Sequence, residues 1–499
     1  MSHFECVPET AVVTGWDFST GAVKCLAFDR RGRTLAEVRL PTDLYTEGGV
    51  TELSLLQLEG QARASVRGMA ARLRDLGRLN DWLAGGISAT HHTAGRIDAN
   101  SNPVRRAICW NDQTLGAFHA KGLARLGGPE RVKELLGGPW AVRYSLSHLV
   151  KDETTLSAAD WQRTRWMLPH GPLAAGYLTG RFDCTSISSA ASTGLMDFRT
   201  NRWQPAMLDA LASAEYRELA LANLPHILGD EPIGTLAEAP VRPLIFPTLD
   251  DQAAGLVGGG AVDAGQVAVI LGNSAVVNSS AASAPASGTL DAMKLNWGPY
   301  LWMRCYSNGA QFLDRVVGGH PDWPKLEAAA GAVPAGCGGV AVSPFVLSEP
   351  SLGIASPKFG WSPSEPSDVG VRVRASFEAL AYLIALAVRE HEAAGQRITR
   401  VSVSGGIAKS ELMLTILASV LNRPLERLVS SEGPALGAAV AAMAGYESYL
   451  RRKAGVAGPF GVADAVAQMV AFQEPVRPRA EWVAVYERGL AAFRSAIGV

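Results

Sequence analysis

The chain has 499 residues, of which 47% are hydrophobic and 19% are charged, and its formal net charge is -1. This composition is ordinary for a folded protein and argues against a wholly disordered chain. The near-neutral charge offers no general attraction for nucleic acid or an anionic membrane. At about 100–200 residues per domain, the length predicts two to four domains.

The first ten residues contain no Lys or Arg, so we expect no secretory signal there. The best apolar helical run, residues 379–388, is too short to span a bilayer. Six cysteines are scattered along the chain without a CxxC pair, which argues against a zinc site and a disulfide framework. We therefore expect a cytoplasmic protein.

The first predicted elements form a hairpin. Residues 11–16 and 22–29 are strand-like, and the polar segment 17–21 between them reads as a turn. Apolar residues at helical spacing predict a helix over 54–76. Residues 85–88 read as the end of a further strand that runs into a polar loop.

The middle of the chain changes in character. After a turn-and-strand unit at 101–113, residues 120–235 read as mostly helical, with the clearest helix over 206–221 behind Pro205. Prolines are frequent between 230 and 250, and because proline cannot donate a backbone hydrogen bond, this stretch predicts a connection between larger units.

The second half begins as the first half does. Strand 266–271, the tight turn 272–274 and strand 275–277 repeat the strand–turn–strand theme roughly 250 residues later, which hints at two related halves. A helix over 374–394, a short strand at 401–403, and helices over 410–421 and 438–444 follow. Both halves are therefore predicted to be mixed α/β.

Three turns could bind phosphate groups. Asp17 stands beside Ser19-Thr20-Gly21, where backbone N–H groups and hydroxyls suit phosphate oxygens and a carboxylate can hold Mg²⁺. The turn Gly272-Asn273-Ser274 offers similar groups. Ser404-Gly405-Gly406 lies between a strand and a helix, and the N-terminus of a helix favours an anion. A turn that serves only the backbone is the commoner explanation for each motif alone. A GxxxxGK[ST] sequence is missing, which argues against a P-loop kinase.

Further polar clusters could act on a substrate. Asp250 and Asp251 precede a small-residue helix, where they could serve as an N-cap or as a general base. His91 and His92 are adjacent, and because neighbouring side chains on a strand face opposite ways, we expect one hydrogen-bonding His and no bidentate metal site. Trp110-Asn111-Asp112 could be an aromatic platform for a sugar, or Trp110 could belong to the core.

Taken together, the motifs resemble those of the FGGY carbohydrate kinases over residues 12–495. The segment Asp17–Lys24 resembles the family's first phosphate segment, D-x-G-T-x-x-x-[KR], and Ile87–His92 resembles the sugar-binding stretch of xylulokinases, with His92 on the family His and His91 on the usual Met. The other matches, in chain order, are Trp110–Gln113 with W-N-D-x of the pentulose branch, Tyr177–Gly180 with L-T-G, Asp251–Gly255 with D-[NQ]-A-A, Gly272–Ser274 with G-T-S, Asn308–Ala310 with the turn facing the nucleotide, Arg374–Glu378 with R-A-x-x-E, Ser404–Ser410 with S-G-G-x-A-K-S, and Leu436–Ala439 with G-A-A.

The resemblance implies two ribonuclease-H-like α/β domains of the actin and hexokinase kind around a central cleft, a sugar-binding domain over 1–255 and an ATP-binding domain over 256–499. It implies transfer of the ATP γ-phosphoryl group to a ketopentose, with D-xylulose the leading substrate and ATP and Mg²⁺ as cofactors. Asp251 would be the catalytic base and Asp17 would hold Mg²⁺. The residues implied at the sugar are His91, His92, Trp110, Asn111, Asp112 and Gln252, and those at ATP and its phosphates are Ser19, Thr20, Lys24, Gly272, Asn273, Gly309, Gly405, Gly406, Ala408 and Gly437.

Several residues depart from the family pattern. Ser19 replaces a Gly, Asn273 replaces the Thr of G-T-S, and Asp250 adds a carboxylate beside the base. Two alternatives therefore stay open: a kinase for another ketose or polyol (L-ribulose, L-fuculose, glycerol or gluconate), and a non-catalytic sugar or nucleotide sensor with the same fold. We expect a sugar and ATP as partners, with neither nucleic acid nor membrane, and a homodimer is a candidate assembly.

Overall fold

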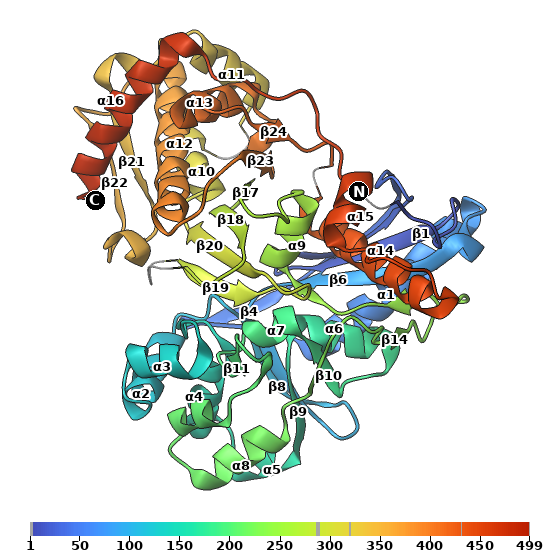
Figure 1. Ribbon diagram of the computed structural model, residues 1–499. Coiled ribbons are helices and arrows are strands. Elements are labelled where there is room, and N and C mark those ends of the chain that lie inside the picture. Colours follow the sequence, from blue (N-terminus) through green and yellow to red (C-terminus); the bar gives the residue numbers. More distant parts are fainter. Residues whose placement is uncertain (1–2, 286–289, 319–320, 431, 499) are drawn as a thin grey trace.

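The computed structural model describes residues 3–285, 290–318, 321–430 and 432–498. Two large sheets dominate it (Figure 1). The first contains β1 (Val12–Phe18), β2 (Ala22–Phe28), β3 (Thr34–Pro41), β6 (Trp82–Ala89), β14 (Gly234–Thr235), β15 (Leu244–Ile245) and β16 (Leu249–Asp250). The second contains β17 (Gln266–Leu271), β18 (Ala275–Ala281), β19 (Asp291–Lys294), β20 (Tyr300–Tyr306), β23 (Arg400–Ser404) and β24 (Glu426–Arg427).

The two sheets share one strand order. In the first sheet the order is β3-β2-β1-β6-β15, with the first three strands antiparallel and the next two parallel to β1. In the second it is β20-β18-β17-β23-β24, with the same directions. This repeat confirms the two related α/β halves that the paired strand–turn–strand units predicted.

Smaller sheets extend the first half. A five-stranded sheet has the order β4-β5-β8-β7-β9, and its strands are β4 (Leu44–Glu47), β5 (Val50–Leu53), β7 (Ala94–Asp98), β8 (Pro103–Ile108) and β9 (Thr164–Pro169). Three two-stranded sheets are β10 (Cys184–Ser186) with β13 (His226–Leu228), β11 (Met196–Asp197) with β12 (Arg202–Trp203), and β21 (Ala341–Phe345) with β22 (Lys358–Ser362).

The helices surround these sheets. Those before residue 260 are α1 (Leu55–Asp75), α2 (Leu115–Arg125), α3 (Pro129–Leu136), α4 (Ser145–Thr155), α5 (Ala158–Arg163), α6 (His170–Thr179), α7 (Ile187–Ala191), α8 (Ala214–Ala222) and α9 (Asp251–Gly258). Those after it are α10 (Ala310–Val317), α11 (Trp323–Gly331), α12 (Val369–Ala393), α13 (Glu411–Leu421), α14 (Gly433–Ala454), α15 (Val462–Met469) and α16 (Ala480–Ile497). Short 3₁₀ helices are η1 (Leu79–Asp81), η2 (Pro205–Ala210), η3 (Cys337–Gly339), η4 (Pro350–Leu352) and η5 (Ile407–Lys409).

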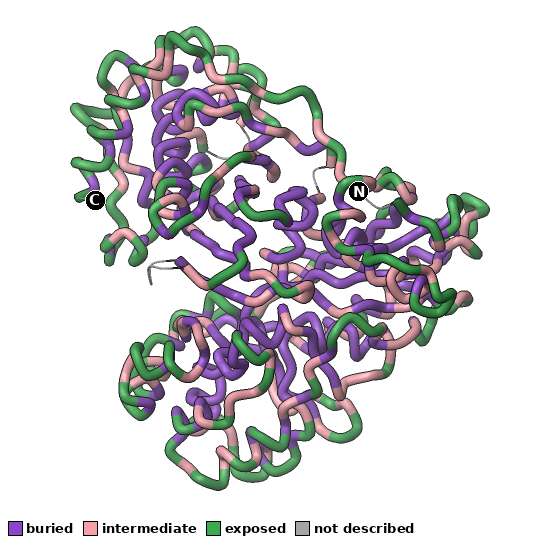
Figure 2. Tube along the Cα trace, viewed as in Figure 1, coloured by how far each residue is buried: buried purple, intermediate pink, exposed green. Residues whose placement is uncertain are grey.

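The first sheet is buried on both faces, which explains why β1 is buried along its whole length (Figure 2). Alternate side chains of a strand point to opposite faces. Val12 and Trp16 belong to the core formed with α1, whereas Val13 belongs to the core formed with α14. Gly15 and Asp17 therefore lie on the α14 side of the sheet.

Helix α14 comes from the end of the chain and yet packs against the start of it (Figure 1). The contacts are close because glycines stand at each of them. A Cβ on Gly15 of β1 would lie 1.8 Å from the Ala435 carbonyl oxygen, and one on Gly437 would lie 1.8 Å from the Ala254 carbonyl oxygen of α9. Helix α14 thus joins β1 to α9. The division between residues 255 and 256 falls inside α9 and stays a prediction.

Two expectations about local structure were wrong. The helix predicted over 206–221 is divided into η2 and α8, because Leu211 is extended and the Ser213 side chain caps a new helix by accepting from the Tyr216 N–H. His91 and His92 do not lie on a strand: β6 ends at Ala89, and they occupy the turn that follows.

All six cysteines lie in the described residues, and each is free. Among the helices of the described ranges, none combines the length and apolar character needed to cross a membrane.

Candidate active site

Three strand ends of the first sheet converge at one edge. Strands β1, β6 and β16 are parallel, with Asp17 paired to Ser88 and Asp250 to Ala89. Their carboxyl ends therefore meet where α9 begins, and open α/β sheets bind ligands at such an edge. The Ser88 hydroxyl donates to the Asp17 carboxylate at 3.3 Å, so the strand register explains why Asp17 and the start of α9 face the same place.

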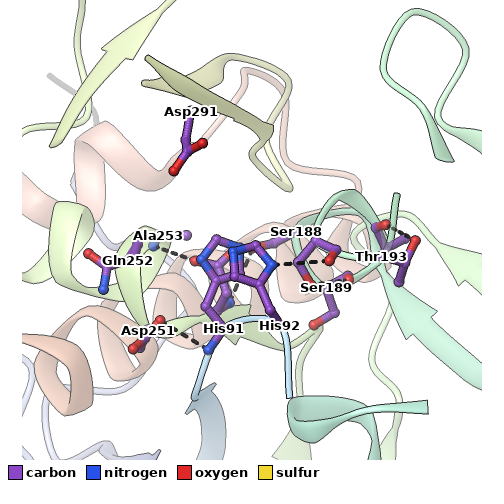
Figure 3. Close-up of polar contacts among 12 residues, drawn as sticks. His91, His92, Ser188, Ser189, Thr193, Asp251, Gln252, Ala253 and Asp291 are labelled. Carbon is purple, nitrogen blue, oxygen red and sulfur yellow. Dashed lines mark hydrogen bonds and ion pairs between the residues drawn. The ribbon is translucent and has the colours of Figure 1, made fainter. Parts of the chain in front are cut away.

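The neighbouring carboxylates Asp250 and Asp251 have different surroundings. Asp250 is the N-cap of α9: it accepts from the Ala253 N–H at 2.8 Å, and the Ser188 hydroxyl donates to it at 2.7 Å. Asp251 accepts from the His91 backbone N–H at 3.2 Å and is only partly buried (Figure 3). The capping role, which the sequence left open between the two, therefore belongs to Asp250.

The electrostatics of the site favour protonation of Asp251. Burial raises its pKa to about 8, and the charges of Asp250 and Asp17 contribute to this increase against the hydrogen bond from His91. Burial also raises the pKa of Asp17 to about 6, although the ammonium of Lys24 opposes the shift. Carboxylates with strongly raised pKa values at a polar sheet edge are candidates for acid–base chemistry.

The rings of His91 and His92 are stacked with their centroids 3.5 Å apart (Figure 3). His92 is stacked in turn on Tyr144. His92 has a φ of 61°, a conformation open to a turn and not to a strand, so the expectation that the two rings face opposite ways was wrong. His92 Nδ1 lies 3.1 Å from the Ser192 carbonyl oxygen. Burial lowers the pKa of both imidazoles, and both rings are therefore neutral at pH 7.

The remaining residues expected at the sugar occupy different environments. Trp110 and Asn111 are exposed, whereas Asp112 is buried and accepts from Lys151 Nζ at 2.8 Å. The Gln252 side chain accepts from Asn278 Nδ2 at 3.0 Å, which ties α9 to the second sheet. Asp112 and Gln252 are thus engaged with protein groups, and their contact with a sugar stays a prediction.

A cavity of about 920 Å³ lies on the second-half side of this edge. Its walls include Lys24, Gly272, Asn273 and Gly406, four of the residues expected at ATP. Gly405 and Ala408 line an adjoining cavity of about 270 Å³, and Lys409 borders both cavities. The structure therefore brings Lys24 of the first half and the turns at 272–274 and 404–406 of the second half around neighbouring spaces.

The other residues expected at ATP are placed as follows. The Ser19 hydroxyl donates to the Ala22 carbonyl oxygen at 2.8 Å, and Thr20 follows it in the same turn. The Gly309 N–H donates to the Asn273 carbonyl oxygen at 3.0 Å, beside the larger cavity. Gly437 lies in the contact of α14 with α9. The nucleotide contacts of these residues stay predictions.

Several residues at these sites carry no motif that the sequence could reveal. Arg39 and Trp323, which belong to no motif, also line the larger cavity. Phe377 and Lys409 line it too; they stand within the R-A-x-x-E and S-G-G-x-A-K-S matches but were not among the residues expected at ATP. The Arg143 guanidinium, from the loop before α4, forms an ion pair with Asp291 of β19 and so joins the two halves beside His91. Arg39 could have been found only from the pairing of β3 with β2. In that register Arg39 lies opposite Lys24, and both residues line the cavity.

Two sets of residues could hold a cation. Asp17 is buried and accepts from the Ser88 hydroxyl, and a bound cation would oppose the burial that raises the pKa of its carboxyl. His91, Asp250 and Asp251 place one ligand atom each within 4.8 Å of the others, but Asp250 is already committed to the cap of α9. Asp17 is therefore the better candidate for Mg²⁺, which prefers oxygen ligands.

The two repeated α/β halves, with a polar edge where parallel strands end, are the kind of architecture in which enzymes of the α/β class bind their ligands. The N-terminal domain of the FGGY family of carbohydrate kinases matches residues 12–239, and the C-terminal domain of that family matches residues 314–446. This chain therefore belongs to the FGGY family of carbohydrate kinases.

Known relatives and structures agree with this membership. The chain is similar to the glycerol kinase of Rhizorhabdus wittichii, with 26% identity over 470 residues that cover 87% of this chain and 88% of the relative. It is similar to the xylulose kinase of Escherichia coli K12, with 26% identity over 457 residues that cover 85% and 88%. The ligand-bound crystal structure of the xylulose kinase from Lactobacillus acidophilus superposes with a TM-score of 0.84 at 16% identity, covering 98% of this chain and 99% of that one, which shows the shared fold.

Proposed function

We propose that the chain transfers the γ-phosphoryl group of ATP to a hydroxyl of a ketopentose, with D-xylulose as the first candidate. The observation that carries the proposal is Asp251. Its neighbour Asp250 serves as the helix cap, so Asp251 is left as a partly exposed carboxylate with a raised pKa at the convergence of three strand ends.

Asp251 acts as the general base. The sugar hydroxyl is a poor nucleophile, and transfer of its proton to a carboxylate oxygen of Asp251 accompanies formation of the new P–O bond while the bond to the ADP oxygen breaks. Such help is typically worth about 10²–10⁴ in rate. The rest of the acceleration comes from positioning and from neutralising the charge of the phosphates.

Asp17 and Lys24 act on the phosphate side. Asp17 would hold Mg²⁺, which supplies positive charge to the phosphates when it is bound. Lys24 lies opposite Asp17 on the adjacent strand and lines the larger cavity. These positions support a triphosphate that extends from the cavity toward the edge where Asp251 lies.

The sugar is proposed to lie beside the stacked histidines. The Nε2 atoms of His91 and His92 are buried without a hydrogen-bond partner in the described part of the chain. A buried polar atom that lacks a partner costs about 1–3 kcal/mol, so a sugar hydroxyl that bonds to either ring recovers part of that cost. The relatives include a glycerol kinase and a xylulose kinase, and the choice of a pentulose rests on His92 and Trp110-Asn111-Asp112.

The substrate choice predicts a ranking. In an assay of ADP release, D-xylulose should give the highest kcat/KM in a panel with L-ribulose, D-ribulose, L-fuculose, glycerol and gluconate. A preference of more than about tenfold, or 1.4 kcal/mol, for glycerol or gluconate would contradict it. Sugar binding without turnover of any panel member would favour the sensor instead.

The raised pKa of Asp251 predicts the pH dependence of catalysis. A base acts only when deprotonated, so kcat/KM for the sugar should rise with pH up to about 8 and then level off. The measurement is a pH–rate profile at saturating Mg·ATP with the buffer held at constant ionic strength. A profile that is flat between pH 6 and 9 would show that Asp251 does not titrate in the reacting enzyme.

A further inference from the structure

A row of polar side chains crosses the first sheet. Ser88 of β6 pairs with Asp17 of β1, Asp17 with Lys24 of β2, and Lys24 with Arg39 of β3. Directly opposite residues on neighbouring strands point to the same face of a sheet. All four side chains therefore lie on the face that α14 covers, and Arg39 stands at the outer end of the row.

The charges along this row are not equally balanced. Lys24 Nζ lies 2.6 Å from a carboxylate oxygen of Glu432, directly before α14, and it also faces Asp17 across the strand pair. The positive charge of Lys24 is thus countered by two acids. Arg39 is exposed and has no acidic partner among the residues that the structure describes.

Arg39 and Lys24 are the two residues of the first half that line the 920 Å³ cavity, whose other walls come from residues between 271 and 410. The acids on those walls are Asp314 and Glu327. Glu327 accepts from the Ser410 hydroxyl at 2.8 Å and from the Leu412 N–H at 2.9 Å, and neither acid forms an ion pair with Arg39 in the described structure. Arg39 therefore brings a positive charge, without an ion-pair partner among the described residues, from the first half of the molecule to a cavity whose other walls come mainly from the second half.

We propose that Arg39 binds a phosphate group of the nucleotide polyphosphate that occupies this cavity. The inference rests on the proposed function. It adds a phosphate-binding residue that lies outside the three phosphate turns. A guanidinium binds two phosphate oxygens at once and keeps its charge under all physiological conditions. Because Arg39 comes from the first half, this contact would reach the nucleotide from the side opposite the walls formed by residues between 271 and 410.

An exposed arginine has a simpler explanation. Strand β3 is at the end of the sheet order, and charged side chains on edge strands prevent pairing with other chains. A charge that serves only this purpose would leave nucleotide affinity unchanged when it is removed, and the two explanations therefore give different results.

The test measures the dissociation constants of ATP, ADP and adenosine by isothermal titration calorimetry for the wild type, Arg39→Ala and Arg39→Lys. Arg31→Ala is the matched control, because Arg31 is an exposed arginine in the turn between β2 and β3 and does not line the cavity in the described structure. Thermal unfolding of each variant verifies that the fold is retained.

We expect Arg39→Ala to weaken ATP binding by at least about tenfold, the size of a charged hydrogen bond, with adenosine affinity unchanged. Arg39→Lys should recover part of the loss because it keeps the charge without the two-pronged contact, and Arg31→Ala should match the wild type. Equal ATP affinity in Arg39→Ala and the wild type would overturn the inference while leaving the kinase proposal intact, and so would an equal loss for adenosine. A wild type that binds no ATP would overturn the kinase proposal itself.

Discussion

Asp251→Asn should lower kcat by at least about 100-fold, because the amide cannot take the proton of the sugar hydroxyl. The affinity for ATP should stay close to that of the wild type, since the larger cavity is lined by other residues. Steady-state kinetics with the best sugar of the panel, together with calorimetric titration of ATP, measure the two quantities separately.

Asp250→Asn is the matched control. Asparagine is as good an N-cap as aspartate, so its side-chain oxygen can still accept from the Ala253 N–H, and turnover should fall far less than in Asp251→Asn. Near-normal turnover in Asp251→Asn, or a larger loss in Asp250→Asn, would show that the other carboxylate is the base.

Stability measurements separate a lost base from a damaged fold. The folded-state pKa of Asp251 is raised to about 8, above the ordinary value of about 3.9 in an unfolded chain. Between these values the folded state holds a proton that the unfolded state releases, so this carboxylate lowers wild-type stability as pH rises through that window. Asp251→Asn has no such dependence, and its melting temperature relative to the wild type should therefore increase from pH 5 to pH 8.

Gly437→Ala should lower the free energy of unfolding by about 3 kcal/mol, at the upper end of the usual cost of overpacking. The added methyl group would lie 1.8 Å from the Ala254 carbonyl oxygen and 2.7 Å from the Gly258 amide nitrogen. Both are backbone atoms of α9, so relief requires the two helices to separate. Chemical denaturation measures the loss, and kcat should fall as well because Asp251 begins α9.

Gly60→Ala provides the comparison. Gly60 lies within α1, and a Cβ there would meet no atom within 4 Å. Alanine in such a place stabilises a helix by about 0.5–1 kcal/mol. If Gly437→Ala were as stable as the wild type, α14 and α9 would have to be further apart than the structure shows.

Much of the fold could be predicted from local pattern. Apolar spacing predicts the hairpin of β1 and β2, helix α1 and helix α12. The repeat of the strand–turn–strand unit predicted a second half related to the first. The prediction of one helix over 206–221 was wrong because Ser213 caps a new helix in the middle of an otherwise helical pattern. The extended Leu211 and the Ser213 cap thus divide a segment whose apolar spacing alone does not reveal the break.

The site was less accessible to such reasoning. Motifs pointed to Asp251 and Lys24, but no local pattern shows that Asp250 caps α9, that Lys24 meets Glu432, or that Arg143 meets Asp291. These contacts join residues as much as 408 positions apart. The contacts of Lys24 with Glu432 and of Arg143 with Asp291 depend on how the sheets and α14 are assembled, which sequence spacing does not encode.

The place of α14 has a consequence for how the chain acquires its structure. One face of the first sheet, with Val13, Leu26 and Ala84, is covered by residues 433–454. During synthesis this apolar face is made hundreds of residues before the helix that shields it, and contacts of such long sequence separation form slowly. This face of the first sheet therefore stays uncovered until nearly the whole chain has left the ribosome. During that time it can aggregate or bind a chaperone.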